Sequence, residues 1–326
     1  ILFCLISLSD LLQFYNMLGH LKEKLLNCAY FFFSSTDHYT ELPIDEADKI
    51  FILPWYNSSQ PTIIFAHGFT GWPGGPAVNS VTGAYLQHGG YNVVLLNWDR
   101  LAAAVNPNKA NSYVNWAAPN ARKLGVKFAG TLEALALAGL DLNNTHLIGH
   151  SLGAHIFGIA GNRLQERGIL LPWITGLDPA GVGFEGKPPV NRLNPKSAEF
   201  VAVVHSDPSK YGFSRALGTV DFWPNYKNGQ VRQPGCKKER PIRCITFCSI
   251  ADICSHNRCW ELLIDTLKYP GTILGSYAKN FRTWKNYSAY QRNLTVLELA
   301  KRPLVPGNYY FVTKADSPYG LGELGL

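Results

Sequence analysis

A G-x-S-x-G pentapeptide lies at the centre of the stretch 144–160, NTHLIGHSLGAHIFGIA, and constrains the fold more than any other feature of the chain. The apolar residues before it predict the end of a buried strand, and those after it predict a buried helix with a C-cap at Gly168. Between a strand and a helix, this motif forms a sharp, strained turn that exposes the serine hydroxyl. Its glycines, Gly149 and Gly153, have no Cβ and let the strand and the helix approach closely. Ser151 is therefore the candidate nucleophile, with a chance match as the alternative.

The composition is typical of a globular protein. Because 46% of the 326 residues are hydrophobic and 16% are charged, the chain can bury a large core, which argues against long disordered segments. The net charge of +7 and the pI near 9.0 favour anionic surfaces such as lipid head groups. The sequence has no basic stripe interleaved with aromatic residues, which argues against nucleic acid as a partner.

Predicted strands and helices alternate along the chain. Apolar runs predict strands at residues 51–54, 62–66, 91–98, 173–177 and 200–205, and helical patterns occupy residues 76–87 and 112–140. The run YNVVLLNW at 91–98 is nearly continuous, as expected of a strand that is covered on both faces. This order predicts an α/β fold with a mostly parallel central sheet and helices on both faces.

Residues 1–9, ILFCLISLS, form an apolar run that is too short to span a bilayer. We interpret it as the core of a partial signal segment at residues 1–17, with an N-terminal core segment as the alternative. Of the seven cysteines, Cys4 lies in this segment and the other six form an even set. Since no C-x2-C pair is present, that set favours disulfides in a secreted, extracellular protein over a metal site. Four N-x-S/T sequons agree and predict glycosylation at Asn57, Asn143, Asn286 and Asn293.

Four stretches together resemble the pancreatic-lipase family of α/β-hydrolases: FAHGFTG at 65–71, IGHSLGAH at 148–155, ITGLDPAG at 174–181 and CSHNRC at 254–259. The segment DFWPNYKNGQVRQPGC at 221–236 is also similar to this family, and the closest likeness is to arthropod secreted single-domain lipases and phospholipases A1. The resemblance implies one catalytic domain at residues 29–322 with the α/β-hydrolase fold. Residues 307–322 look like the last strand of that domain, so we expect neither the C-terminal β-sandwich domain of the pancreatic enzymes nor a colipase-type partner.

The resemblance further implies a serine hydrolase that cleaves carboxyl esters of lipids at a membrane or emulsion surface, without a metal or an organic cofactor. The alternative from another class is a catalytically silent storage or lipid-binding protein, similar to the yolk proteins of some insects that have lost the nucleophile. The serine, aspartate and histidine of the pattern and its H-G-F loop are all intact in this chain, which favours an active enzyme. A small-ester hydrolase conflicts with the covering loop described below.

A serine nucleophile needs a histidine base and a carboxylate that orients this base, in the order Ser, acid, His in α/β-hydrolases. Asp178 follows the predicted strand 173–177 and precedes a turn, so it can reach the edge of the sheet that carries Ser151. Its place in the GLDPA pattern of the family favours it over three rivals: Asp207, Asp221 and Asp252.

Of the nine histidines, His205 and His256 are the two that follow Asp178. His205 closes a predicted strand, which favours a structural hydrogen-bonding role, whereas His256 matches the catalytic histidine of the family. The histidines nearer the serine are interpreted as scaffold or hydrogen-bonding groups: His67, His150 and His155. The expected donors to the oxyanion are the backbone N–H groups of Leu152 and, by match to the family, Phe69.

The sequence departs from the family at its structural calcium site. Mammalian relatives carry an R-L-D-P-S-D-A stretch there, and the matching segment in this chain is RLNPKSA at 192–198. Asn194 and Ser197 replace the two aspartates, and Lys196 lies between them. Because calcium prefers several carboxylate oxygens, we expect this calcium site to be absent.

The resemblance pairs Cys236 with Cys254 as the disulfide of a lid, which leaves Cys244 with Cys248 and Cys28 with Cys259. The enclosed residues 237–253, KKERPIRCITFCSIADI, are expected to form a lid over the serine. Their first half is basic and their second half is apolar, which suits a lid that rests on an anionic lipid surface and then opens. A solvated loop that packs its apolar side on the body is the alternative.

Two covering loops bear on the class of lipid. The lid is shorter than that of pancreatic triacylglycerol lipases, and the segment between His205 and Asp221 is also short. In the family that the chain resembles, short loops accompany an open site that admits polar head groups. The sequence therefore favours phospholipid or mixed activity over strict hydrolysis of neutral lipids.

Overall fold

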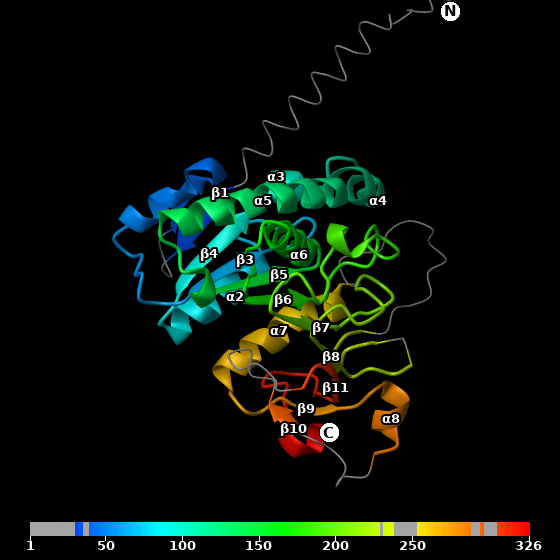
Figure 1. Ribbon diagram of the computed structural model, residues 1–326. Coiled ribbons are helices and arrows are strands. Elements are labelled where there is room, and N and C mark those ends of the chain that lie inside the picture. Colours follow the sequence, from blue (N-terminus) through cyan, green and yellow to red (C-terminus); the bar gives the residue numbers. More distant parts are fainter. Residues whose placement is uncertain (1–29, 35–38, 229–230, 238–252, 288–293, 297–304) are drawn as a thin grey trace, which may run out of the picture.

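The computed structural model describes residues 30–34, 39–228, 231–237, 253–287, 294–296 and 305–326 (Figure 1). Strands in these ranges form one sheet with the order β10-β9-β11-β8-β7-β6-β5-β3-β4-β1-β2. Its parallel centre consists of β3 (Thr62–Ala66), β4 (Asn92–Asn97), β5 (Thr145–His150), β6 (Trp173–Leu177), β7 (Phe200–Val204), β8 (Val220–Pro224) and β11 (Gly307–Phe311). The prediction of a mostly parallel sheet is confirmed.

Antiparallel strands complete both edges of the sheet. At one edge, β1 (Tyr30–Ser34) pairs with β4 and with β2 (Tyr39–Pro43). At the other edge, β9 (Leu274–Tyr277) pairs with β11 and with β10 (Leu294–Val296). The apolar runs in the sequence predicted none of these four strands.

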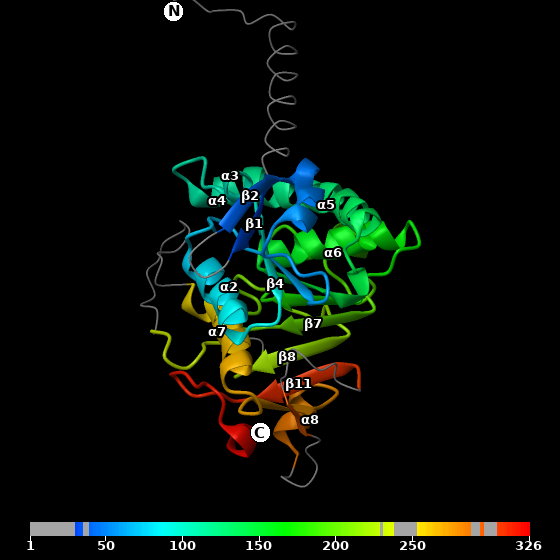
Figure 2. The ribbon, with the colours of Figure 1, turned by 90° about the vertical axis from the view of Figure 1, so that its left-hand side faces the viewer.

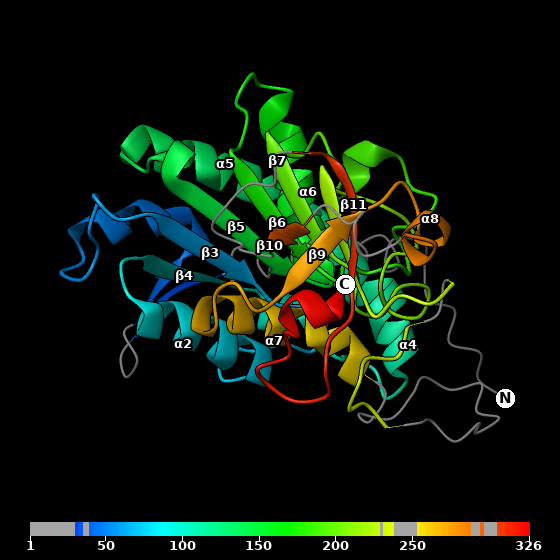
Figure 3. The ribbon, with the colours of Figure 1, turned by 90° about the horizontal axis from the view of Figure 1, so that it is seen from below.

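Two layers of helices cover the two faces of the sheet. Helices α5 (Ala118–Ala138) and α6 (Leu152–Gln165) lie on one face, and α2 (Pro76–His88) and α7 (Cys254–Lys268) lie on the other (Figures 2 and 3). The shorter elements are η1 (Ile44–Ile52), α3 (Asp99–Ala102), α4 (Lys109–Ser112), η2 (Tyr113–Ala117), η3 (Leu142–Asn144), η4 (Pro189–Asn191), α8 (Phe281–Lys285) and η7 (Gly322–Gly325).

The central strands carry apolar side chains on both faces because the sheet contributes to two cores. In β3, Ile64 and Ala66 pack into the core under α5 and α6, while Ile63 and Phe65 pack into the core under α2 and α7. Successive side chains of a strand point to opposite faces, so a strand covered on both sides has no polar face. This arrangement confirms the predicted α/β class.

Two predictions about local structure need correction. Residues 51–54 are not a strand, because they belong to the 3-10 helix η1 and the turn after it. The buried side chains there, Ile44, Ala47 and Ile50, recur every three residues, and Ile52 is 81% exposed. The predicted helix 112–140 is divided into the π-helical turn η2 and α5, which ends before Gly139 at a φ of +124°.

Candidate active site

Ser151 occupies the turn between β5 and α6, at the carboxyl edge of the parallel sheet. Its φ of 57° and ψ of −114° are strained for a residue with a side chain, and its N–H donates to the carbonyl of Leu177 at 2.9 Å. A Cβ on Gly149 would lie 2.4 Å from the backbone nitrogen of Ala154, and one on Gly153 would lie 2.2 Å from the Ala66 carbonyl oxygen. The turn can therefore form only with glycine at both positions.

Asp178 directly follows β6, the neighbour of β5, and its side chain is fully buried. Its backbone is also left-handed, with a φ of +44°. The Oδ1 atom accepts hydrogen bonds from the backbone N–H groups of Ser206 at 2.9 Å and Asp207 at 3.0 Å. A Cβ on Gly212 would lie 2.4 Å from this oxygen, so the segment after β7 is shaped around the carboxylate.

His256 lies in the first turn of α7 and donates from Nδ1 to Asp178 Oδ2 at 2.5 Å. Its own carbonyl oxygen accepts from the Cys259 thiol at 3.1 Å and from the Ser206 hydroxyl at 3.4 Å. The imidazole of His150 lies beside it, with ring centroids 4.8 Å apart. Both ends of the histidine are thus held, and its Nε2 remains for a reacting group.

Burial determines the protonation of this pair. It raises the pKa of Asp178 to about 7, opposed by the hydrogen bond from the Asp207 N–H, by the nearby His205 and by the Ser206 N–H. It lowers the pKa of His256 to about 3. Because the two groups are hydrogen-bonded to each other at 2.5 Å, they titrate as one unit and not as two independent groups.

Ser151 and His256 line the same cavity of about 440 Å³. Aromatic and aliphatic side chains form much of its wall, including Trp72, Tyr113 and Val182. Of the described residues that line it, Lys109 is the one lysine or arginine, and none is an aspartate or a glutamate. The structure therefore brings the serine and the histidine to one apolar cavity, with Asp178 bonded behind the histidine.

Of the two residues expected to supply oxyanion donors, Phe69 lines this cavity and Leu152 directly follows Ser151. Phe69 packs edge-on against Tyr113, with ring centroids 5.4 Å apart. A Cβ on Gly68 would lie 2.8 Å from the Cβ of Ser151, so the loop of Phe69 approaches the serine closely. Leu152 is the first residue of α6, where a backbone N–H has no acceptor within the helix.

The rivals of Asp178 and His256 have other partners. Asp207 contributes its backbone N–H to Asp178, and Asp221 contacts His205 Nε2 at 2.7 Å in the buried sheet. His155 contacts the Ala180 carbonyl with Nε2 at 2.8 Å and accepts the Leu193 N–H at Nδ1, which is a scaffold role. Asp252 lies outside the described residues.

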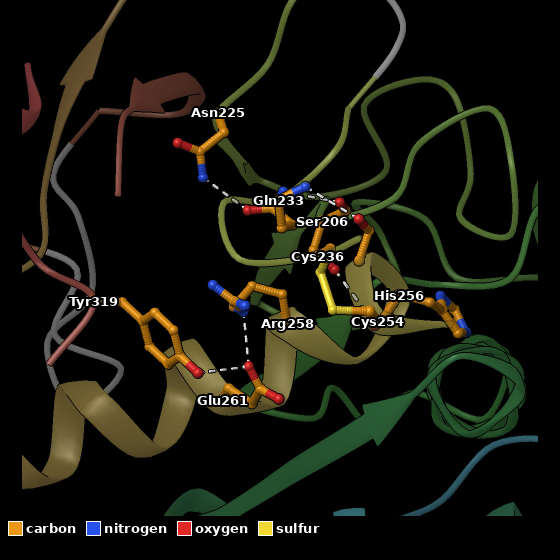
Figure 4. The surroundings of a disulfide bond; sticks show 10 residues. Ser206, Asn225, Gln233, Cys236, Cys254, His256, Arg258, Glu261 and Tyr319 are labelled. Atoms are coloured by element: carbon orange, nitrogen blue, oxygen red, sulfur yellow. Dashed lines mark hydrogen bonds and ion pairs between the residues drawn. A yellow bond between two sulfur atoms is a disulfide. The ribbon is translucent and has the colours of Figure 1, made fainter. Parts of the chain in front are cut away.

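The structure contains the disulfide between Cys236 and Cys254 that the resemblance implied (Figure 4). Ile253, next to it, lines the cavity, so the base of the expected lid lies beside Ser151. Cys259 is a free, buried thiol, and the expected pairing with Cys28 is therefore wrong. Residues 238–252 of the lid, including Cys244 and Cys248, lie outside the described residues, as do Cys28 and the segment 1–17.

Comparison with known families identifies the chain, because residues 21–319 match the family model described as Lipase. The chain belongs to the lipase family. Lipase member H-B of Xenopus laevis is 34% identical over 236 residues, which are 71% of this chain and 46% of that protein. Phospholipase A1 of Vespa crabro is 32% identical over 266 residues, or 80% of this chain and 83% of that protein. The chain therefore spans about half the length of the lipase H relatives.

Solved structures are also similar to this lipase-family chain. A phospholipase/carboxylesterase from Dyadobacter fermentans aligns with 62% of this chain and 76% of its own, with a TM-score of 0.30 and 9% identity. No described helix is long and apolar enough to cross a membrane. Within the described ranges, no group of three or more His, Cys, Asp or Glu side chains is placed to hold a metal ion.

Asn194 and Ser197, which stand where the mammalian relatives carry two aspartates, are both hydrogen-bonded to Asn162 of α6. Asn194 Nδ2 donates to Asn162 Oδ1 at 2.9 Å and to the carbonyl oxygen of Pro189 at 3.1 Å. Asn162 Nδ2 donates to the same Pro189 oxygen and to that of Arg192, at 3.1 and 3.0 Å. N–H donors thus fill the positions around these oxygens, and this set of side chains does not fit a calcium ion.

We therefore expect no stabilisation by calcium. The melting temperature should be the same in millimolar calcium chloride and in a chelator, because the amide pair already holds the 189–197 segment on α6. Differential scanning fluorimetry measures this directly, with magnesium chloride at equal ionic strength as the control. A rise in melting temperature that is specific to calcium would contradict this assignment.

Some residues that support the site have no sequence motif of their own. The N–H groups of Ser206 and Asp207 and the missing side chain of Gly212 all shape the pocket of the carboxylate. Gln233 is fully buried in the base of the disulfide loop. The sequence offered one signal that Gln233 supports the site, because this residue lies three positions before Cys236 in the segment that is similar to the family.

Proposed function

We propose that this chain is a serine hydrolase that cleaves carboxyl esters of lipids through an acyl–Ser151 intermediate. The observation that carries the proposal is the arrangement of three residues. Ser151 lies at a strained turn, and His256, hydrogen-bonded to the buried Asp178, lines the same cavity. This is the combination that activates a serine hydroxyl for acyl transfer.

In this mechanism, Ser151 Oγ attacks the ester carbonyl while His256 Nε2 accepts its proton. The negative charge that develops on the carbonyl oxygen is stabilised by the N–H groups of Phe69 and Leu152, each contributing about 2.7–4 kcal/mol. His256 then gives the proton to the departing alcohol, and water cleaves the acyl–serine by the same steps. Asp178 orients the imidazole and stabilises its charged form.

The cavity supports a lipid substrate that is reached at a membrane or emulsion surface. Trp72 and Val182 line the cavity while 51% and 44% exposed, so apolar side chains face solvent at its rim. Lys109 adds a positive charge that suits a phosphate group. Together with the similarity to phospholipases A1, these features favour phospholipid or mixed activity over strict hydrolysis of neutral lipids.

Product analysis tests the function and the class of lipid together. The chain is incubated with mixed vesicles of phosphatidylcholine, phosphatidylserine and triacylglycerol, and the released fatty acids and lysolipids are identified by mass spectrometry. We expect release of the sn-1 fatty acid from the phospholipids. Rapid turnover of triacylglycerol without phospholipid cleavage would contradict the phospholipid preference, and an inert chain would favour the alternative of a lipid-binding or storage protein.

We also propose that the protein is extracellular and glycosylated. A disulfide is stable in an oxidising compartment, and the chain has one beside the site. Three of the sequon asparagines, Asn57, Asn143 and Asn286, are exposed, as attachment of a glycan requires, and Asn293 lies outside the described residues.

A further inference from the structure

Gln233 lies at the base of the loop that the Cys236–Cys254 disulfide closes, and its side chain is fully buried. Its Nε2 donates to the carbonyl oxygens of Ser206 at 2.8 Å and Pro224 at 3.1 Å. Its Oε1 accepts from Asn225 Nδ2 at 2.7 Å (Figure 4). Because every polar atom of this amide has a partner, its position and that of the two carbonyls are fixed together.

One of these hydrogen bonds reaches the Asp178 carboxylate through a single peptide. The carbonyl of Ser206 and the N–H of Asp207 belong to the same planar unit. Gln233 donates to the carbonyl oxygen of this peptide, and the N–H of the same peptide, which is that of Asp207, donates to Asp178 Oδ1 at 3.0 Å. A peptide that accepts a hydrogen bond at its oxygen is polarised and becomes a stronger donor at its nitrogen.

A second link runs from Gln233 to the start of α7. The backbone N–H of Gln233 donates to the Ser255 hydroxyl at 3.0 Å, and its carbonyl accepts the Cys236 N–H at 3.1 Å. Ser255 lies directly between Cys254 of the disulfide and His256. Gln233 therefore contacts both Ser255, which precedes His256, and the 206–207 peptide, which binds Asp178.

We propose that Gln233 is a positioning residue for the hydrolytic reaction: it holds the 206–207 peptide so that its N–H supports the charged carboxylate of Asp178 behind His256. This inference rests on the proposed function, because it concerns the same aspartate and histidine. It goes beyond that function in assigning a role to the base of the disulfide-closed loop. Neither the spacing of Gln233 from the triad nor its residue type suggests that role.

Other titratable groups also face the Asp178–His256 pair and remain in place when Gln233 is changed. His150 and Tyr211 lie against the His256 ring, and the charge of His205 acts on Asp178. The remaining groups are the Cys259 thiol at the His256 carbonyl, Asp207 next to the shared peptide, and Asp221 on His205. A change in the pH profile of a Gln233 variant therefore reports the lost amide.

The test replaces Gln233 by methionine, which has a similar length but no donor. We expect kcat per active site to fall about tenfold with little change in KM, as for the loss of one hydrogen bond that acts on the catalytic pair. The acid limb, which is the part of the pH profile where kcat/KM falls with falling pH, should move to higher pH. A less supported carboxylate holds the proton of the Asp178–His256 pair more tightly. Active sites are counted with a covalent organophosphonate, so unfolded chains do not contribute.

Two control variants separate positioning from simple destabilisation. Ser255→Ala breaks the link to α7 but leaves the 206–207 peptide intact, so the acid limb should stay in place. Asn162→Leu removes another buried amide that binds three backbone carbonyls away from the site, and should lower the melting temperature without moving the limb.

An unshifted limb with unchanged kcat per active site in Gln233→Met would overturn the inference while leaving the proposed function intact. An inert wild-type chain would overturn the proposed function itself. If the methionine variant does not fold, Gln233→Asn decides the question, because it keeps an uncharged amide but draws its NH₂ back from the Ser206 carbonyl by one methylene. Its limb should move in the same direction, and an unmoved limb there also overturns the inference.

Discussion

Replacing Ser151 by alanine is expected to lower kcat for lipid-ester hydrolysis by a factor of about 10⁶. Without the hydroxyl no acyl–enzyme can form, and only the weak effects of binding and of the oxyanion donors remain. Hydrolysis is followed by fatty-acid release from phospholipid vesicles. In the wild type, mass spectrometry after treatment with an organophosphonate should place the adduct on Ser151.

The matched control is Ser80→Ala, the same substitution within α2 at a position that does not line the cavity. It should keep wild-type kcat and react fully with the inhibitor. Hydrolysis that survives in Ser151→Ala, or an adduct on another residue, would remove the triad assignment. The Ser151→Ala substitution removes one hydroxyl and leaves in place the glycines that the turn requires. We therefore expect an unreactive but folded protein, and circular dichroism verifies its fold.

The parts of the fold that follow from local sequence were predictable. The strands β3 to β7 are apolar on both faces, so their runs are conspicuous, and the glycines of the turn at Ser151 are needed within a few residues of it. The run at 51–54 failed because a short apolar segment does not distinguish period two from period three. The edge strand β1 depends on pairing with the distant β4, and β9 depends on pairing with the distant β11. In β2 only Leu42 is buried, so neither face of this strand has an apolar pattern.

The candidate site shows the same division. Ser151, Asp178 and His256 are side chains with recognisable patterns, whereas the support of Asp178 comes from backbone N–H groups of a loop 28 and 29 residues away. Backbone donors carry no residue identity, so no sequence pattern marks them. Cys259 misled for a related reason. An even number of cysteines favours pairing, but this thiol lies on the buried face of α7, where it donates to the His256 carbonyl.

Replacing Asp178 by asparagine is expected to lower kcat about 10⁴-fold with little loss of structure. The backbone N–H groups of Ser206 and Asp207 both point at Oδ1, so the amide oxygen must take that place. The amide NH₂ then faces His256 Nδ1 and forces the imidazole into the tautomer that carries its proton on Nε2. That nitrogen can no longer accept the proton of Ser151. Rates per titrated active site measure the effect.

The pH dependence of kcat/KM in the wild type also depends on the Asp178–His256 pair. Below an apparent pKa near 7 the Asp178–His256 pair holds an additional proton, and kcat/KM should fall with falling pH along a limb of one proton. The proton belongs to the pair as a whole, and it removes the charged carboxylate and neutral imidazole that together accept the proton of Ser151. In Asp178→Asn the limb should move to lower pH, because a buried imidazolium without its carboxylate is disfavoured.

Asp265→Asn is the control for Asp178→Asn, since Asp265 is a buried carboxylate of α7 that accepts from the Ser317 hydroxyl outside the site. It should cost stability but leave both kcat per active site and the acid limb unchanged. A wild-type profile that is flat from pH 5 to pH 8, or an Asp178→Asn variant with full activity, would show that another group orients His256. Asp221, a buried carboxylate of β8, would then be the group to replace next, because its partner His205 already acts on the Asp178 pocket.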